Sequence, residues 1–340
     1  MAQPNLSALG RALIIVNPAA QSGAAAAAAD RLQRFLTLYC HRDSFEVART
    51  ERPRHAIELA AAAGAYDTVL ALGGDGVVHE VANGLMRIEK GSPRPTLGVV
   101  PVGSGNDFAR TLGLTDVADV RGTDFSALFS CRPTPIDLMR IDWESGATDP
   151  RPDAVAAGTP VRRGTTYAVE TFSMGLDAAI GLGTHDLRKI TGLTGAALYT
   201  ASGMRAFGRG YRCFDSFVSF DGKRAEHLRT ITFAVQNGPT YGSGFRICPN
   251  ADPADGLLDV CYAQGPAPRA IALPVFLSAK NGGHVGNRRI RMQRVRSASF
   301  TFAEAGYPIQ VDGEHLEATR LVIEVVPAAL TVLKPMGAER

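Results

Sequence analysis

Hydrophobic residues in the first 140 positions form short runs, separated by stretches in which apolar side chains recur with helical spacing. The runs predict strands at Ala12–Val16, Phe45–Arg49, Thr68–Leu72, Thr96–Val100 and Ile136–Ile141. The stretches between them predict helices at Ser22–Leu38, Ala56–Ala63, Val77–Ile88 and Thr123–Ser130. Because strands that alternate with helices pair in parallel, we expect a parallel sheet with helices on both faces.

The pattern changes after Asp142. Residues 144–165 are rich in Gly, Pro, Asp and Ala, which is typical of a loop or an insertion. Alternating runs then predict strands at Tyr167–Phe172, Phe214–Phe220, Arg229–Gln236, Leu257–Ala263, Ala298–Thr301, Ile309–Val311 and Leu321–Val326. Two helices interrupt these strands, at Ala196–Phe207 and Ile271–Ala279. We therefore expect a second, mainly antiparallel β domain of the sandwich or barrel type, with a cleft between the two domains.

Two glycine-rich turns follow neighbouring strands of the predicted parallel sheet. The first is Gly73-Gly74-Asp75-Gly76, and the second is Gly103-Ser104-Gly105-Asn106-Asp107. Glycines let backbone N–H groups converge on an anion, and the following helix start favours negative charge. Each turn alone is also compatible with an ordinary tight turn that has Asp as a helix cap. Because both turns lie at the carboxyl edge of one sheet, together they favour a phosphate-binding site.

Composition narrows the function classes. The chain has 340 residues, enough for one large or two ordinary domains, and its net charge of +3 is too small to indicate nucleic-acid binding. Five cysteines without a C-x-x-C pair suggest free thiols in a reducing compartment. The apolar run at Ala12–Val16 ends at Asn17-Pro18, too early for a signal peptide, and no stretch is long enough to span a membrane. We expect a cytoplasmic protein that meets any lipid at the inner membrane surface.

Several motifs resemble, in order, those of the diacylglycerol kinase catalytic-domain family, which includes bacterial lipid kinases, sphingosine kinases and ceramide kinases. They are Asn17-Pro18, the Gly73–Gly76 turn followed by Glu80–Leu85, Pro101–Arg110, Gly242–Gly244 followed by Pro249–Ala251 and Asp255–Val260, and Val311–Glu314. The resemblance implies an α/β class of fold: an NAD-kinase-like parallel α/β domain over 11–138 with a C-terminal return at 328–337, and an antiparallel β-sandwich lipid-binding domain over 139–327. The active site is then expected in the cleft between the two domains.

The implied activity is an ATP- and Mg²⁺-dependent lipid kinase that phosphorylates the hydroxyl of a neutral lipid, with diacylglycerol as the expected substrate. A kinase of another lipid alcohol, such as a sphingoid base, stays open. A nucleotide- or lipid-binding regulator without turnover also stays open, because Val77 stands where the family usually has Thr. The lost hydroxyl predicts weaker nucleotide binding rather than none. The partners expected are ATP and a lipid at a membrane surface, with a homodimer possible.

The resemblance also assigns residues to the nucleotide site, which are Asn17, Gln21, Ser22, Thr50, Gly73, Gly74, Asp75, Gly76, Glu80, Gly103, Ser104, Gly105, Asn106 and Asp107. For Thr50, an ordinary Thr at a strand end is an equally good interpretation. Asp75 and Asp107 would repel each other unless a cation or water network lay between them. The family pattern implies a Mg²⁺ and water network that they share with Asp137 and Asp255.

The Asp312-Gly313-Glu314 run gives the candidate catalytic residues. Asp-Gly is also the commonest hairpin turn, which would leave Glu314 simply solvated. Within the family pattern, Glu314 is the general base that takes the proton from the lipid hydroxyl, and Asp312 supports it. A metal in the β domain would use Asp255 with the backbone carbonyls of Asp252 and Leu257, although the acidic neighbour in the family pattern is Ala254 here.

Two further segments have a structural and a functional interpretation. The run 288–296 contains five arginines, which suit either a solvated edge strand or a patch that docks on anionic lipid. The segment Leu182–Phe207 carries an apolar stripe, which either belongs to the core or walls a pocket for an acyl chain.

Overall fold

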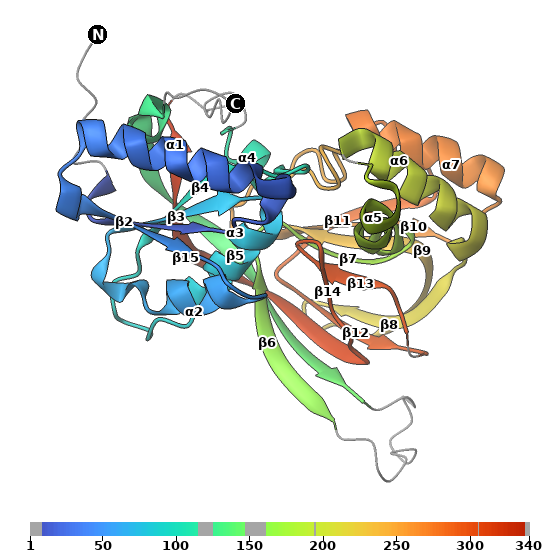
Figure 1. Cartoon of the computed structure of the whole chain (residues 1–340). Coiled ribbons are helices and arrows are strands. Elements are labelled where there is room, and N and C mark those ends of the chain that lie inside the picture. The colour runs from blue at the N-terminus through green and yellow to red at the C-terminus, as the bar shows by residue number, and fades with distance from the viewer. Residues whose placement is uncertain (1–8, 115–124, 147–160, 194, 305, 337–340) are drawn as a thin grey trace. The chain divides into compact units, whose positions relative to one another are not determined.

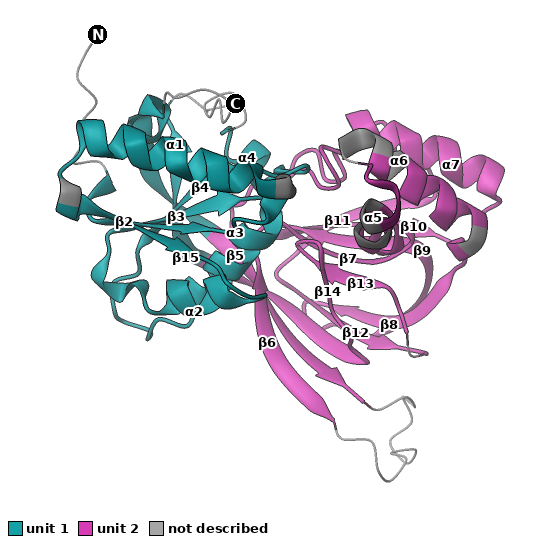
Figure 2. Ribbon diagram, in the orientation of Figure 1, with its two compact units in different colours: residues 1–136, 328–340 teal, residues 137–327 magenta. Residues whose placement is uncertain are grey.

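The computed structural model describes residues 9–114, 125–146, 161–193, 195–304 and 306–336. The chain forms two compact units (Figure 2). Unit 1 consists of Met1–Ile136 with Ala328–Arg340, and unit 2 consists of Asp137–Pro327.

The sheet of unit 1 is parallel, in the order β15-β4-β3-β1-β2. Its strands are β1 (Ala12–Val16), β2 (Phe45–Arg49), β3 (Thr68–Gly73), β4 (Thr96–Pro101) and the end of β15 (Arg320–Pro335). Every residue of β1 and β3 is buried, as expected of strands covered by helices on both faces. The predicted parallel sheet is therefore confirmed.

Helices cover both faces of this sheet (Figure 1). They are α1 (Ala24–Tyr39), α2 (His55–Ala61), α3 (Asp75–Leu85) and the short α4 (Asp107–Thr111), with 3₁₀ turns η2 (Ala20–Gly23), η3 (Arg42–Ser44), η4 (Ala63–Ala65) and η5 (Ser126–Ser130). The connection from β1 to β2 runs opposite to those from β2 to β3 and from β3 to β4. Right-handed crossovers therefore place α1 on one face and α2 with α3 on the other.

The sheet of unit 2 is antiparallel, with β14-β13-β7-β9-β8-β12-β15 as one path, β10 between β9 and β11, and β5 beside β6. The strands are β5 (Cys131–Ser145, which starts in unit 1), β6 (Arg162–Ala168), β7 (Thr171–Gly175), β8 (Phe214–Phe220), β9 (Glu226–Gln236), β10 (Leu258–Gln264), β11 (Ile290–Val295), β12 (Ser297–Phe302), β13 (Ile309–Val311) and β14 (Glu314–His315). The buried core centres on Phe233, whose ring stacks on Tyr262 and meets Phe300 edge-on. The predicted second, mainly antiparallel β domain is confirmed.

Helices of unit 2 group at one side of its strands (Figure 1). They are α5 (Leu176–Thr191), α6 (Gly195–Arg205) continued by the π-helix η6 (Ala206–Gly210), and α7 (Arg269–Ser278) continued by η7 (Ala279–Asn281). The helix α5 was not predicted from the pattern of apolar and polar residues. Among the described residues, no helix combines the length and apolar character that a membrane span requires.

Several predicted elements differ from the structure. The strand predicted at Ile136–Ile141 extends over Cys131–Ser145, and residues 162–165 of the predicted loop belong to β6. The single strand predicted at Tyr167–Phe172 is wrong, because β6 ends at Ala168 and β7 begins at Thr171. The strand predicted at Leu321–Val326 is much longer, since β15 continues to Pro335 and contributes residues to both units. The helix predicted at Thr123–Ser130 is a 3₁₀ turn over Ser126–Ser130, and its first two residues lie outside the described part of the chain, as do residues 147–160 of the predicted loop.

Candidate active site

The two glycine turns of unit 1 are in direct contact. The carbonyl oxygen of Gly73 accepts a hydrogen bond from Val102 N at 2.7 Å, which ties the end of β3 to the end of β4. A Cβ atom on Gly74 would lie 3.1 Å from the Cα of Gly103, and one on Gly103 would lie 2.6 Å from the Cα of Gly74. Because real Cβ atoms do not approach backbone as closely as 2.6 Å, Gly103 requires glycine, and a side chain at Gly74 would be tightly packed. The result is a cradle of backbone at the start of α3, which is suited to an anion.

Asn106 fixes the shape of the second turn. Its backbone is left-handed, with φ of 53°, a conformation that Asn tolerates better than most residues. Its Oδ1 accepts a hydrogen bond from Gly103 N at 2.8 Å, and its Nδ2 donates to Gly103 O at 3.0 Å. The side chain of Asn106 thus closes the turn before α4 begins at Asp107, and Ser104 and Gly105 lie between Gly103 and Asn106.

Asp75 and Asp107 converge on Gly105. A Cβ atom on Gly105 would lie 2.7 Å from Asp75 Oδ2 and 3.4 Å from Asp107 Oδ2. Asp75 Oδ1 accepts a hydrogen bond from Phe108 N at 3.3 Å, and Arg110 Nη1 lies 2.7 Å from Asp107 Oδ1. The guanidinium therefore compensates part of the repulsion between the two acids. Arg110 was not singled out from the sequence, although its spacing of three residues from Asp107 on a helix was a signal for this pair.

Asn17 and Thr50 follow the neighbouring strands β1 and β2. Asn17 Oδ1 accepts a hydrogen bond from Ala19 N at 3.1 Å, and Thr50 N donates to Val16 O at 2.9 Å. The parallel register places both residues at the sheet edge at which β3 and β4 end in their glycine turns. Gln21 and Ser22 lie in η2 beside them, and their side chains fall outside the described part of the structure.

Glu80 and Val77, both on α3, make structural contacts. The carboxylate of Glu80 accepts hydrogen bonds from Arg54 N at 3.1 Å and Ala56 N at 3.2 Å, so it caps the start of α2. Val77 is buried, and its Cβ would lie 3.2 Å from a Cβ on Gly73. Valine keeps the shape of threonine here and lacks only the hydroxyl, so the turn itself is preserved.

In unit 2, the Asp312 carboxylate clamps a distant turn. It accepts hydrogen bonds from three successive backbone N–H groups, those of Val169 at 2.9 Å, Glu170 at 3.1 Å and Thr171 at 2.9 Å. These bonds hold the break between β6 and β7, which explains why the predicted strand is interrupted. Asp312 is buried, and its φ of 48° lies in the left-handed region, where a residue other than glycine is strained. Its carboxylate therefore has a structural role in this turn.

The clamp presents Glu314 at a fixed position. Glu314 follows the Asp312-Gly313 turn at the start of β14, and its backbone pairs with Val311. Gly313 N donates a hydrogen bond to the side chain of Gln310, which braces the same turn. Glu314 itself is exposed. The hairpin is therefore rigidly attached to unit 2, while its carboxylate is accessible to other molecules.

The residues predicted for a metal in the β domain do not fit a resident cation. Asp255 forms an ion pair with Arg294, and its Oδ1 accepts a hydrogen bond from Leu257 N at 3.0 Å. Asp252 Oδ1 accepts a hydrogen bond from Ala254 N at 3.0 Å. Among the described residues, no group of three or more His, Cys, Asp or Glu side chains is arranged to hold a metal ion. The guanidinium of Arg294 supplies the positive charge beside Asp255.

Asp137 is attached to the same turn. Its Oδ2 accepts a hydrogen bond from Gly256 N at 2.7 Å, and its backbone N donates to Pro253 O at 2.7 Å. Nearby, burial and the charge of Asp252 raise the pKa of Asp259 to about 6. The structure thus gathers the predicted acids Asp137 and Asp255 around one turn of unit 2.

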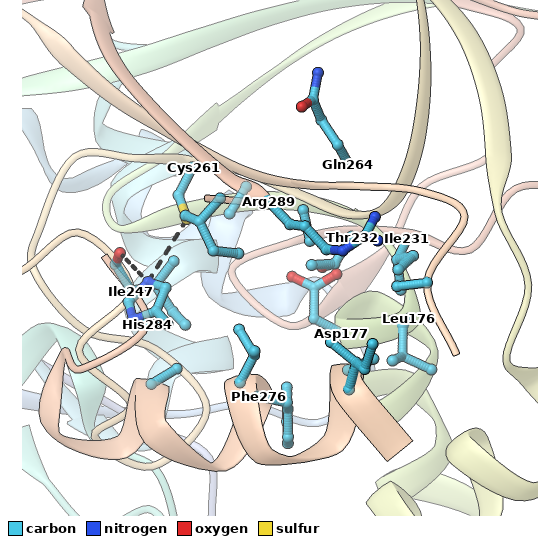
Figure 3. Close-up of a pocket in the computed structure, with 18 of the residues that line it drawn as sticks. Leu176, Asp177, Ile231, Thr232, Ile247, Cys261, Gln264, Phe276, His284 and Arg289 are labelled. Carbon is cyan, nitrogen blue, oxygen red and sulfur yellow. Dashed lines mark hydrogen bonds between the residues drawn. The ribbon is translucent and has the colours of Figure 1, made fainter. Parts of the chain in front are cut away.

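Unit 2 also contains an apolar pocket that is open to solvent (Figure 3). Its walls come from the start of α5, from η6, from β9 and β10, and from α7 with η7. Phe207, at the end of the predicted apolar stripe, lies in the wall together with Ile231 and Phe276. The pocket therefore has the mainly apolar lining of a small-molecule site.

Burial disfavours charge on three of its polar side chains. Asp177 is buried, Tyr241 donates a hydrogen bond to its Oδ2 at 2.6 Å, and burial raises the pKa of Asp177. Burial also raises the pKa of Cys261 to about 12 and lowers the pKa of His284. The guanidinium of Arg289 also lines the pocket, so any charge in its wall is positive.

Comparisons with known proteins agree with these two units. Residues 11–141 match the family model of the diacylglycerol kinase catalytic domain, and residues 170–334 match the model of the YegS C-terminal NAD kinase β-sandwich-like domain. A "Probable lipid kinase YegS-like" protein of Pseudomonas aeruginosa is 31% identical, over 84% of this chain and 82% of that protein. A diacylglycerol kinase of Mycobacterium tuberculosis is 29% identical, over 96% of each chain. A diacylglycerol kinase structure from Bacillus anthracis shares the fold, with a TM-score of 0.66, 18% identity and coverage of 97% of this chain and 99% of that one.

The parallel α/β unit with its glycine cradle and the antiparallel β-sandwich define the class of two-domain kinases. The chain belongs to the lipid kinase family that carries the diacylglycerol kinase catalytic domain. The resemblance seen in the motifs is thereby confirmed. Membership of a kinase family implies ATP as the phosphoryl donor.

Proposed function

We propose that this protein transfers the γ-phosphoryl group of ATP to the hydroxyl of diacylglycerol. The observation that carries the proposal is the convergence of Asp75 and Asp107 on Gly105, beside the contact between Gly74 and Gly103. Backbone N–H groups at the start of α3 would bind phosphate oxygens, and Asn17, Thr50 and Ser104 would contact the nucleotide from the same sheet edge. The two carboxylates would hold the Mg²⁺ that accompanies ATP through water.

Glu314 is the proposed general base. Phosphoryl transfer requires positioned reactants and a group that accepts the proton of the attacking hydroxyl. Glu314 is exposed on a hairpin that Asp312 and Gln310 hold in place, so its carboxylate can reach a substrate without losing its orientation. We assign Asp312 the positioning role, because its oxygens already accept three backbone hydrogen bonds.

The pocket beneath α7 is proposed to bind an acyl chain of the lipid. Its lining is mainly apolar, burial disfavours charge on Asp177 and His284, and Arg289 in the wall is positive, which suits an uncharged chain rather than a cation. A sphingoid base carries an ammonium group, which such an environment disfavours. Diacylglycerol is therefore preferred over a sphingoid base, and the protein would act as a peripheral enzyme at the inner membrane surface.

The test is a panel of lipid alcohols assayed with labelled ATP, with wild-type protein and Glu314→Gln. We expect diacylglycerol to be phosphorylated fastest and Glu314→Gln to lower turnover by roughly 10²- to 10⁴-fold. Binding of a non-hydrolysable ATP analogue, measured by calorimetry, should be unchanged. Glu317→Gln is the matched control, since Glu317 is a nearby exposed glutamate paired only at the surface with Arg162.

Two results would reject parts of this proposal. Near-normal turnover of Glu314→Gln would remove that residue from the mechanism. Nucleotide binding without phosphorylation of any lipid would indicate the non-catalytic regulator that Val77 leaves open.

A further inference from the structure

The helix α7 has an unusual combination of composition and position. Only Arg269 and Ser278 are polar among its ten residues, yet none of these ten, all of them described, is buried. A helix that is apolar all round normally lies in a protein core or in a membrane environment. The apolar surface of α7 is therefore left without the partner that its sequence predicts.

The inner face of α7 packs on unit 2. The ring of Phe276 lies 5.5 Å from that of Phe207 and 5.3 Å from that of Phe245. Ala272 and Val275 pack against the buried clusters on either side. The same face forms one wall of the apolar pocket, as Figure 3 shows for Phe276.

The outer face presents leucines to solvent. Leu273 is 42% exposed and Leu277 is 58% exposed. The two residues are four positions apart, so they lie one above the other on the same side of the helix. Ile271, at 45% exposure, lies on the pocket side of the helix instead. The two leucines, grouped in this way, mark a binding surface rather than ordinary exposure.

Basic residues lie at both ends of this helix. Arg269 is four positions before Leu273 and Lys280 is three positions after Leu277, so both lie on the side of the two leucines. Between Asp259 and Glu304 the sequence contains no acidic residue, whereas it contains Arg269, Lys280 and the five arginines of 288–296. The whole chain has a net charge of only +3, so the basic residues are concentrated in this segment. A partner for the segment would be expected to carry negative charge.

Most of this charge is not neutralised within unit 2. Arg269 Nη2 donates to Gly208 O at 3.0 Å, and Lys280 Nζ donates to Ser243 O at 3.0 Å, so backbone carbonyls rather than carboxylates hold these side chains. In the part of the chain that the structure describes, Arg269 and Lys280 form no ion pair with an acid. Of the run 288–296, Arg294 forms an ion pair with Asp255.

We propose that the outer face of α7, with Arg269 and Lys280 at its two ends, docks on an anionic lipid bilayer. Leu273 and Leu277 enter the boundary between headgroups and acyl chains, and the two basic side chains contact lipid phosphates. The combination of exposed leucines with uncompensated charge of one sign fits a bilayer surface. The inference deepens the proposed function, because a lipid leaving the bilayer beside α7 would enter the pocket that the inner face of the same helix lines.

The test is flotation of the full-length protein with vesicles that contain neither ATP nor diacylglycerol. One set is pure phosphatidylcholine, and the other is an equimolar mixture with phosphatidylglycerol. We expect binding to the anionic vesicles only, weakened by added salt. Each basic residue near such a surface contributes about fivefold to partitioning, so Arg269→Glu with Lys280→Glu should weaken binding by roughly 25-fold or more.

A second variant tests the apolar contact. Leu273→Glu with Leu277→Glu should weaken anionic-vesicle binding by a similar factor, and the exposure of both positions leaves the fold intact by circular dichroism. The controls are Leu38→Glu, an exposed leucine of α1, and Arg87→Glu with Lys90→Glu, exposed cations of unit 1. Both controls should float like the wild type.

Failure of docking and failure of the kinase assignment give different results. Vesicle binding by either α7 variant at the wild-type level, or equal wild-type binding to both vesicle types, overturns the docking surface whatever the activity. Loss of binding in both variants supports it even where no lipid is phosphorylated. With an active kinase, the variants should lose activity on vesicle-borne diacylglycerol and keep it on a water-dispersed short-chain diacylglycerol.

Discussion

At the scale of single residues, the site depends on glycines, which have no side chain, as much as on the side chains of its polar residues. Gly103 approaches Gly74 so closely that it could not carry a side chain, and the carboxylates of Asp75 and Asp107 both approach Gly105. The glycines bring the two strand ends together, and the acids then share a small volume. Replacement of a single glycine should therefore alter nucleotide binding more than its distance from any reacting atom would suggest.

Gly103→Ala tests this contact. The new Cβ would lie 2.6 Å from Gly74 Cα and 2.5 Å from Asn106 Oδ1, so the two turns must separate. We expect a loss of about 1–3 kcal/mol in the free energy of unfolding, as for other overpacked sites, and weaker ATP binding. Thermal unfolding and calorimetry with an ATP analogue measure the two effects. Gly64→Ala, at an exposed glycine with open space around it, is the control, and equal ATP affinity in the two variants would contradict the prediction.

The sequence predicts some of these residues and not others, for a physical reason. Gly73 to Gly76 stand between an apolar run and a helical pattern, so their place at a sheet edge follows from local order. The clamp of Asp312 on Val169 joins residues 143 positions apart, and no local pattern indicates such a contact. Glu80 was predicted in the nucleotide site from its motif, and only the structure shows its bonds to the start of α2.

At the scale of elements, the turn before β10 has an ion pair at the position where the family pattern implies a metal. The family pattern implies acids for a cation here, but Ala254 replaces one acid and Arg294 of β11 reaches Asp255 and lies 3.6 Å from Asp259. Since β10 and β11 are adjacent antiparallel strands, Asp259 and Arg294 are directly opposite each other in the sheet. A cross-strand pair of opposite charge stabilises such strands without a metal.

We predict that a chelator leaves the thermal stability of nucleotide-free wild-type protein unchanged. Arg294→Gln should lower the free energy of unfolding by about 1 kcal/mol, because the side chain is half exposed and the pair is partly screened. Added Mg²⁺ should restore part of this loss, since Asp255 and Asp259 then lack a cation. Arg291→Gln on the same strand is the control and should respond to neither reagent. A fall in wild-type stability on chelation would show that a resident metal is needed after all.

At the scale of the whole molecule, the two structural units do not follow one another along the chain, because unit 1 contains residues from both ends of the sequence. β15 lies in unit 2 at its beginning and in unit 1 from Ala328 onward, where Ala328 has φ of 48°. Hydropathy predicted a strand at Leu321–Val326, and the family resemblance, not the local pattern, indicated that the last strand returns to the first domain. The final segment completes the parallel sheet, with Val332 paired to Leu97. Unit 1, the proposed nucleotide-binding unit, therefore depends on residues at the far end of the sequence.

Leu333→Ala measures that dependence. Leu333 is 2% exposed, and its Cδ1 would lie 2.9 Å from a Cβ on Gly98, so it packs tightly over β4. Truncation of a leucine buried in this way costs about 2–5 kcal/mol. We expect the free energy of unfolding of unit 1, measured with denaturant, to fall by this amount, and bound ATP to restore part of the loss.

The fluorescence of Trp143, which lies in unit 2, should follow nearly the same unfolding transition in the variant as in the wild type. Val322→Ala is a control on the same strand, at a position 40% exposed in unit 2, and should stay within about 0.5 kcal/mol of the wild type. Equal effects of the two substitutions would mean that the end of β15 contributes no more to the nucleotide-binding unit than an ordinary surface position.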